Sequence, residues 1–419
     1  MTLHNPDRAA HTAIVGGGII GLAIAWEVSR RGHRVTLIDP APASGATRAA
    51  AGMLAPVSEL HYQEESLLDL TLPSARAYQQ FTIELEAASG VGTGYQRTQT
   101  LIAGIDPADR QALTDLRSVQ VGLGLKVEEL TTRQARRLEP LLGPQLTSAF
   151  LVPEDHQVDP RAMAAALQAA LAQQPTARTV PVPATALVHD DAADRTAVTG
   201  VLLEDGERID ADEVVLANGL GTANIAGLPA GLRLPLRPVY GDILRLRVPE
   251  HLRPLITSTV RGLVHGSPIY VVPRQEGTVV IGATQRENGS AGLSAGGVYE
   301  LLRDAQTLIP AVAELELLEA LCRPRPGTPD NAPLLGRCRN PDGSEVRGLV
   351  IASGFFRHGV LLAPITARLC TDLISQNVPE VDIERFRPDR FNDPGHVPET
   401  SRYDTSRHNN SPDEVRTAI

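Results

Sequence analysis

The glycine-rich stretch at residues 16–21 constrains the fold of this chain more than any other feature. It lies between an apolar run, residues 12–15, and a helical pattern. Gly16 permits a tight turn, Gly18 lets backbone amides approach a pyrophosphate, and Gly21 lets the helix pack closely against the strand. The pattern therefore predicts a nucleotide-binding βαβ unit.

The unit closes with a second strand-like segment, residues 33–39, which ends in an acidic side chain. Asp39 stands where a carboxylate can accept hydrogen bonds from an adenosine ribose. NAD and FAD share adenosine and pyrophosphate, so the unit alone does not identify the dinucleotide. A flexible glycine loop followed by a surface aspartate is the alternative interpretation, and the complete strand–helix–strand frame disfavours it.

Composition excludes several classes of function. The 419 residues carry a formal net charge of −10, and without a basic block the counterion-release attraction of nucleic-acid binders is missing. No segment approaches about 20 uninterrupted apolar residues, so no membrane span is expected. The three cysteines are widely spaced without a C-x-x-C pair, which argues against a zinc site or disulfide framework. We expect a cytoplasmic protein with no metal site and no nucleic-acid partner.

Periodicity divides the chain between two kinds of sheet. Apolar runs such as residues 213–219 and 348–353 predict strands of the parallel sheet that the βαβ unit begins. Largely alternating apolar and polar residues predict antiparallel strands at 234–248, 263–273 and 277–283. The expected helices include 66–88, one opened by Asp106 as N-cap, 130–142, one opened by Asp159 as N-cap, 298–321 and 359–376.

These elements predict an α/β protein of two domains, a Rossmann-like dinucleotide-binding domain and an antiparallel-sheet substrate domain. The first is expected to be discontinuous, at residues 1–88, 150–233 and 322–388, and the second to comprise 89–149 and 234–321. Residues 389–419 are polar and aperiodic, and we expect them to form a disordered tail.

Three further stretches, together with the glycine loop, resemble the D-amino-acid-oxidase superfamily of FAD enzymes, most closely the glycine oxidases associated with thiamine biosynthesis. They are ATRAAAGMLAP at 46–56, then YVVPR at 270–274 with VIGAT at 280–284, then RPGTPD at 325–330 with GFFRHGVLLAP at 354–364. The resemblance spans about residues 12–385. It implies non-covalent FAD, a Rossmann-like FAD-binding domain and an antiparallel substrate domain.

The resemblance also implies the substrate site. Arg325 stands where relatives hold an arginine that pairs with the substrate carboxylate, and a planar guanidinium suits that bidentate contact. Tyr270 matches a tyrosine of the same pocket, and Arg357 matches an arginine that reaches flavin or substrate. A structural ion pair is the alternative role for Arg325 or its weaker neighbour Arg323, and a core position is the alternative for Tyr270.

The residues expected around the cofactor come from the four motifs and from one strand near residue 186. Arg48 replaces a small hydroxyl residue of relatives, so its side chain either reaches a phosphate or leaves the site. His358 is as well explained by packing as by catalysis. The expected contacts are Gly16, Gly18, Ile19, Ile20, Gly21, Asp39, Pro40, Ala46, Thr47, Arg48, Ala51, Gly52, Met53, Thr185, Ala186, Gly219, Gly354, Phe355, Phe356, Arg357, His358, Gly359, Val360 and Leu361.

The implied reaction is oxidation of glycine or another small amino acid or amine at its α-carbon, with hydride transfer to flavin. Hydrolysis then yields a 2-oxo acid and ammonia, and dioxygen is reduced to hydrogen peroxide. The product is expected to feed thiamine thiazole biosynthesis, and relatives suggest a homo-oligomer. The alternatives are a sarcosine or D-amino-acid oxidase, a dehydrogenase that reduces a quinone, and a non-catalytic flavin-binding subunit.

Overall fold

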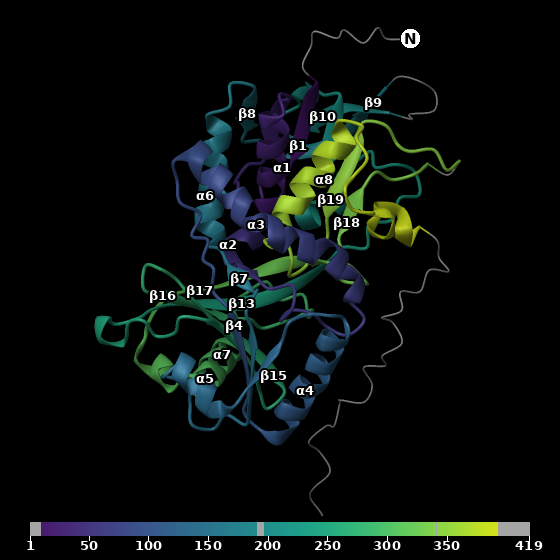
Figure 1. The fold of residues 1–419 in the computed structure, drawn as a ribbon. Helices are drawn as coiled ribbons and strands as arrows, with labels where there is room; N and C mark the ends of the chain where they lie inside the picture. The colour runs from purple at the N-terminus through teal and green to yellow at the C-terminus, as the bar shows by residue number, and fades with distance from the viewer. Residues whose placement is uncertain (1–9, 191–196, 341, 393–419) are drawn as a thin grey trace, which may run out of the picture.

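Two large β-sheets with associated helices organise the chain in the computed structural model, which describes residues 10–190, 197–340 and 342–392. One sheet has six strands in the order β18-β19-β12-β1-β2-β8, and the other has eight in the order β17-β13-β16-β15-β14-β4-β6-β5. Figure 1 shows the six-stranded sheet in the upper half of the molecule and the eight-stranded sheet in the lower half. The expected mixed α/β fold class is confirmed.

The six-stranded sheet contains the predicted parallel strands. Ala13 on β1 pairs with Thr36 on β2 and with Val214 on β12, and all three neighbouring pairs from β2 to β19 run parallel. Only β18 at one edge is antiparallel. The strands are β1 (His11–Val15), β2 (Arg34–Ile38), β8 (Ala177–Val180), β12 (Glu213–Leu216), β18 (Leu334–Gly336) and β19 (Leu349–Ser353).

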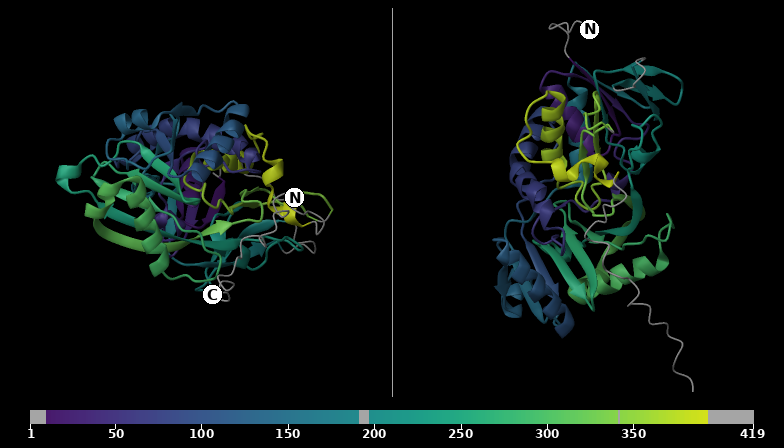
Figure 2. Two further views of the ribbon diagram at one scale, coloured as in Figure 1. Left: turned by 90° about the horizontal axis from the view of Figure 1, so that it is seen from below. Right: turned by 90° about the vertical axis from the view of Figure 1, so that its right-hand side faces the viewer.

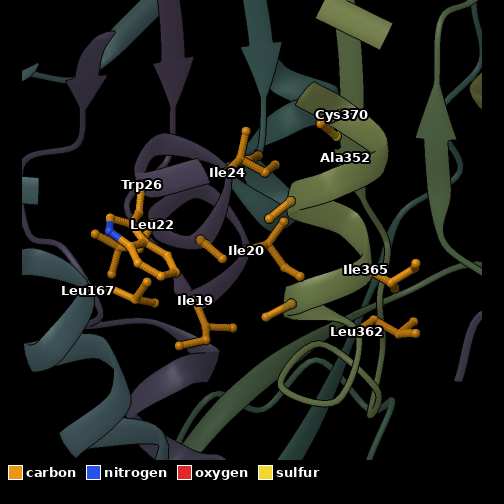
Figure 3. Close-up of a cluster of buried hydrophobic side chains, with 14 of the residues drawn as sticks. Ile19, Ile20, Leu22, Ile24, Trp26, Leu167, Ala352, Leu362, Ile365 and Cys370 are labelled. Atoms are coloured by element: carbon orange, nitrogen blue, oxygen red, sulfur yellow. The ribbon is translucent and has the colours of Figure 1, made fainter. Parts of the chain in front are cut away.

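Both faces of this sheet are covered. Helices α1 (Ile19–Arg30), α6 (Pro160–Ala172) and α8 (Ala363–Ile374) pack on one face, and α3 (Leu68–Ser89) packs against α6 and α8. Figure 3 shows Trp26 of α1, Leu167 of α6 and Ile365 of α8 in the resulting core. A three-stranded sheet of β9 (Ala184–His189), β10 (Val198–Leu203) and β11 (Arg208–Asp210) covers the other face. Strands buried on both faces explain the continuous apolar runs in the sequence.

The eight-stranded sheet is mainly antiparallel, with one parallel pair between β14 and β4. Helix α7 (Ala295–Leu308) buries Leu301, Ala305 and Leu308 against it. Its other helices are α4 (Pro107–Gly122) and α5 (Thr132–Leu138). The strands are β4 (Thr100–Gly104), β5 (Glu128–Leu130), β6 (Ser148–Val152), β13 (Arg237–Arg247), β14 (Thr259–Val264), β15 (Ser267–Pro273), β16 (Thr278–Gly282) and β17 (Glu316–Gly327).

Both predicted aspartate caps are confirmed. Asp106 accepts a hydrogen bond from the amide of Asp109, whose side chain bonds back to complete a capping box at the start of α4. Asp159 accepts from the amides of Arg161 and Ala162 at the start of α6. Each cap is followed by proline, whose missing N–H costs nothing at the first helical position.

The predicted helix at residues 298–321 is wrong in its second half. Helix α7 ends at Leu308, the short 3-10 helix η4 (Pro310–Glu314) follows, and the chain then enters β17. Pro310 cannot continue the α7 hydrogen-bond ladder, and pairing along the whole of β13 overrides the local helical pattern. Pro324 and Pro326 are tolerated in β17 because it is an edge strand.

Two of the expected domain boundaries, after residues 149 and 321, fall inside strands of the eight-stranded sheet. Strand β6 extends to Val152 and β17 to Gly327, and both belong to the eight-stranded sheet. The expected tail also starts too early, because Asp389 lies in the 3-10 helix η6 (Pro388–Phe391) and Phe391 is buried. Residues 393–419, the rest of that tail, lie outside the described residues. Division into two domains along the sheets remains a proposal.

The end of the described chain returns to its beginning. Figure 2 shows α8, coloured yellow, beside the purple N-terminal βαβ unit, and α1 and α8 are in contact. The closing residues therefore complete the first sheet and its helical layer. Across the described ranges, every helix is too short or too polar to cross a membrane.

Candidate active site

A cavity of about 500 Å³ has a wall built from both large sheets. It extends from the glycine loop, past the short helix α2 (Ala46–Ala49) and strand β3 (Met53–Leu54), to residues of β13, β14, β15 and β17. Residues 217–221 and 352–360 complete the wall. The cavity therefore joins the expected dinucleotide site to the expected substrate pocket.

The glycine loop has the geometry that a pyrophosphate requires. Gly16 has φ +105°, and an added Cβ there would lie 2.6 Å from the carbonyl carbon of Ala217. An added Cβ at Gly21 would overlap the Gly16 carbonyl oxygen. Gly18 is the N-cap of α1 and has no side chain to cap the helix. Thr47 Oγ1 accepts from the Ile19 amide at 3.0 Å, and the amides that follow it in the first turn have no cap from Gly18, as an anion site requires.

Asp39 lines the cavity beside this loop. Its Oδ2 accepts from the Gly17 amide at 2.6 Å and its Oδ1 accepts from the Ala41 amide at 2.7 Å. Each carboxylate oxygen has a second lone pair, so the side chain can also accept ribose hydroxyls. These contacts hold Asp39 in place for the role that the sequence predicts.

The strand beside Asp39 differs from the expected one. The Asp39 amide donates to the carbonyl of Val180 at 3.1 Å, at the end of β8. Thr185 and Ala186 lie on β9 in the three-stranded sheet and are not in the cavity wall. Strand β8 is not predicted from the sequence, because it is short and partly exposed and has no clear apolar pattern.

A backbone segment of small residues forms the next part of the wall. Ala49, Ala50, Ala51 and Gly52 leave it almost without side chains, as a planar ring would require. Beneath it, buried Arg274 donates from Nη2 to the Ala51 carbonyl and from Nη1 to Gln157 Oε1 at 2.7 Å. Burial lowers the pKa of Arg274 to about 10, which leaves it charged at neutral pH. Arg274 therefore supports this segment from below.

The structure places the Arg48 side chain outside the cavity wall. Its Nη2 lies 3.1 Å from Glu319 Oε1 on β17, its side chain is half exposed, and it is not in the cavity wall. Arg161 contacts the other oxygen of Glu319 at 2.6 Å. The Arg48 side chain thus links α2 to β17 and faces away from the cavity.

Arg325 and Tyr270 meet at the other end of the cavity. Arg325 reaches from β17 across Gly241 of β13, and its Nη1 donates to the Thr284 carbonyl at 3.4 Å. The Tyr270 ring lies over Gly282, where an added Cβ would be 2.6 Å from its Cζ. Burial raises the pKa of Tyr270, and the adjacent Arg325 opposes that rise. The phenol is therefore protonated at neutral pH and can donate a hydrogen bond.

Two other arginines of the wall are neutralised by glutamates. Arg261 Nη1 lies 2.8 Å from Glu59 Oε1, and Arg357 forms a buried ion pair with Glu64. Arg325, by contrast, forms no ion pair with any carboxylate in the part of the chain that the structure describes. Glu59 and Arg261 are 202 positions apart, and no local pattern in the sequence links them.

The two histidines near Arg357 differ in position. His61 lines the cavity, whereas His358 is buried and outside the wall, as a packing residue would be. Burial is the main cause that lowers the pKa of each, and the charges of Arg357 and Arg261 add to it. Both imidazoles are therefore neutral near pH 7.

The cavity wall contains most of the residues that the sequence predicts for the site. Helix α8 begins at Ala363, so residues 354–362 form a turn, anchored by the Phe356 amide on the Pro326 carbonyl at 2.9 Å. Predicted residues in the wall are Gly16, Gly18, Ile19, Ile20, Asp39, Ala46, Thr47, Ala51, Gly52, Met53, Gly219, Tyr270, Arg325, Gly354, Phe355, Phe356, Arg357, Gly359 and Val360. Gly21, Pro40, Arg48, Thr185, Ala186, His358 and Leu361 lie outside it.

Comparisons with known proteins agree with this arrangement. A family model described as FAD dependent oxidoreductase (DAO) matches residues 11–373. The chain is 32% identical to the glycine oxidase of Geobacillus kaustophilus, over 89% of this chain and 95% of that protein. The crystal structure of glycine oxidase from that organism has a TM-score of 0.80 to this chain, at 32% identity, covering 91% of this chain and 99% of that one.

A longer relative also matches. The bifunctional protein ThiO/ThiG of Trichormus variabilis is 32% identical over 379 residues, which are 90% of this chain and 54% of the relative. The chain therefore spans about half the length of that protein.

Proposed function

The chain belongs to the DAO family of FAD-dependent oxidoreductases, and on that premise we propose that it oxidises glycine and other small amino acids or amines. The products are the 2-oxo acid (glyoxylate from glycine), ammonia and hydrogen peroxide. The observation that carries the proposal is an arginine without a carboxylate partner among the described residues, Arg325, beside the protonated hydroxyl of Tyr270. The name of a further relative, the putative thiamine biosynthesis oxidoreductase ThiO of Rhizobium etli, supports thiamine biosynthesis as the use of the product.

The residues of the wall fit FAD. The glycine loop and the N-terminus of α1 would hold its diphosphate, and Asp39 would accept from its ribose. The small residues from Ala49 to Gly52 would lie along the flavin, with the 354–360 turn beside it. Bound FAD supplies the acceptor for the hydride that leaves the substrate.

The chain's own residues bind and orient the substrate. Arg325 pairs with its carboxylate, and the guanidinium shape favours a bidentate contact. Tyr270 donates its hydroxyl hydrogen to the same carboxylate because its raised pKa keeps the phenol protonated. Together they hold the α-carbon in a fixed position, and positioning of this kind supplies much of the rate. Water would then hydrolyse the released imino acid to the 2-oxo acid and ammonia, and dioxygen would be the final electron acceptor, giving hydrogen peroxide.

An anaerobic assay tests the reaction. Purified holoenzyme is mixed in turn with glycine, sarcosine and D-alanine while the flavin absorbance is followed. We expect glycine to bleach the flavin at least as fast as the others, and air to restore the colour with formation of peroxide. Bleaching without recovery in air would indicate a dehydrogenase, and no bleaching by any amine would contradict the proposal.

The variant Arg325→Met tests the carboxylate contact. We expect the KM for glycine to rise about 100-fold or more, since a charge-assisted contact is worth about 3 kcal/mol. The flavin spectrum should stay that of the wild type, which excludes loss of cofactor. Arg247→Gln is the matched control, because Arg247 is exposed and pairs with Glu316 outside the cavity wall. An unchanged KM in Arg325→Met would refute the assignment.

A further inference from the structure

Two arginines project from the same face of β17 toward different ends of the cavity. Arg323 and Arg325 are two residues apart, which places both side chains on one face of the strand. Arg325 turns to Gly241 and Thr284 at the substrate end. Arg323 turns the other way: its Nε donates to the Ser44 carbonyl at 3.2 Å, and its Nη1 donates to the Cys322 carbonyl at 2.9 Å. Both residues are in the cavity wall.

The contact with Ser44 brings Arg323 next to the glycine loop. The Ala43 amide donates to the Gly17 carbonyl at 2.9 Å, so the segment that carries Ser44 is bonded directly to that loop. A little further along, Thr47 Oγ1 accepts from the Ile19 amide at 3.0 Å in the first turn of α1. Arg323 therefore lies beside the backbone amides that would receive a diphosphate.

The charges of the wall leave Arg323 available for an anion. Four arginines line the cavity, and Arg261 and Arg357 are neutralised by Glu59 and Glu64. Arg323, like Arg325, has no carboxylate partner within residues 10–190, 197–340 and 342–392. Residues 16–21 are glycine and isoleucine and contribute only backbone amides. A diphosphate bound there would receive no side-chain cation from its own loop.

We propose that Arg323 pairs with the diphosphate of FAD. Two arginines on one face of the strand then bind the two anions of the site, the cofactor phosphate at Arg323 and the substrate carboxylate at Arg325. A guanidinium donates in parallel to phosphate oxygens and keeps its charge at any physiological pH. The assignment does not depend on which amine is oxidised, so it stands or fails separately from the proposed reaction.

The test compares FAD with riboflavin, which lacks the diphosphate. Apoprotein of the wild type, of Arg323→Gln and of the control Arg247→Gln is titrated with each flavin, and the dissociation constant is measured from flavin fluorescence. We expect Arg323→Gln to raise the dissociation constant for FAD about tenfold and to leave that for riboflavin unchanged. Added salt should reduce the difference between wild type and variant for FAD. Arg247→Gln should match the wild type with both flavins.

Two results would overturn the assignment. One is wild-type affinity for FAD in Arg323→Gln, and a raised KM for glycine in that case would place Arg323 at the substrate. The other is an equal loss of affinity for FAD and riboflavin, which indicates a structural role. Arg323→Met also removes the charge and serves if Arg323→Gln does not fold: a lower affinity for FAD with unchanged affinity for riboflavin supports the pairing, and wild-type affinity for FAD contradicts it.

Discussion

Glycines make room for the polar side chains at the substrate end of the cavity. Arg325 occupies the space above Gly241, and Tyr270 occupies the space above Gly282. Both glycines lie within strands, where glycine is unfavourable unless another group approaches closely. The motifs that predict Arg325 and Tyr270 do not reveal Gly241, because its role depends on a side chain from the neighbouring strand.

The variant Gly241→Ala tests this arrangement. Its Cβ would lie 2.7 Å from Arg325 Nη2 and 2.8 Å from Cζ. Those atoms end a flexible side chain, so we expect the fold to survive and the guanidinium to move. The KM for glycine should rise about tenfold or more, while the flavin spectrum and Tm stay close to those of the wild type. Gly292→Ala, at a position with open space around it, is the control. A wild-type KM in Gly241→Ala would show that Arg325 does not need this space.

Among the structural elements, the segment at residues 55–64 carries the two glutamates that pair with arginines of the cavity wall. It carries Glu59, which pairs with Arg261, and Glu64, which pairs with Arg357. Asp155 holds the start of this segment, accepting from the amides of Ser58 at 3.1 Å and Val57 at 3.4 Å. Asp155 is fully buried, and burial raises its pKa to about 7 despite these hydrogen bonds.

The raised pKa of Asp155 predicts how stability changes with pH. The folded state binds this proton up to about pH 7, whereas the unfolded chain releases it near the ordinary value of 3.8. The stability that this group contributes is thus complete below the unfolded pKa and is lost as pH rises through 7. From pH 6 to pH 8 we expect the titration of Asp155 to lower the unfolding free energy of the wild type by about 1 kcal/mol.

The side chain of the Asp155→Asn variant cannot titrate, so the unfolding free energy of this variant should not show the fall of about 1 kcal/mol between pH 6 and pH 8. Denaturant unfolding of both proteins at pH 6 and pH 8 measures the difference between the two changes. His61 and His358, whose lowered pKa values favour stability at higher pH, are present in both proteins and cancel from the comparison. Parallel loss of stability in wild type and variant would show that Asp155 is not the group that titrates.

Across the whole molecule, the cavity is the place where the two large sheets meet. Its wall takes residues from β13, β14, β15 and β17 of one sheet and from the loops that follow β1, β2, β12 and β19 of the other. Loops at the carboxyl ends of parallel strands are where ligands of doubly wound folds bind. FAD held there contacts both parts of the fold, so the bound cofactor should stabilise the whole chain.

Removal of FAD should therefore lower the Tm. Binding to the folded state alone adds about 2.7 kcal/mol at a free ligand concentration of 100 times Kd. Thermal unfolding of apoprotein with increasing FAD should show a Tm that rises with FAD concentration, and riboflavin at the same concentrations should raise it less. A Tm that does not respond to FAD would contradict cofactor binding across the two sheets.

The parts of the fold that adjacent residues encode could be predicted from the sequence. The glycine loop, the Asp106 and Asp159 caps and the apolar strands of the parallel sheet depend on local conformation and on burial of contiguous side chains. Arg325 and Tyr270 were found because their motifs are contiguous. Cofactor identity came from resemblance, since the βαβ unit is the same for NAD and FAD.

Contacts between distant segments could not be predicted in this way. Arg48, an expected cofactor contact, pairs instead with Glu319, which is 271 positions away in the sequence. Arg357 pairs with Glu64, which is 293 positions away. The strand state of residues 316–321 likewise depends on pairing with β13. A helical pattern in the sequence does not reveal that its residues will pair with a strand, and a charged residue does not reveal its ion-pair partner. These partners come together only when the two sheets assemble.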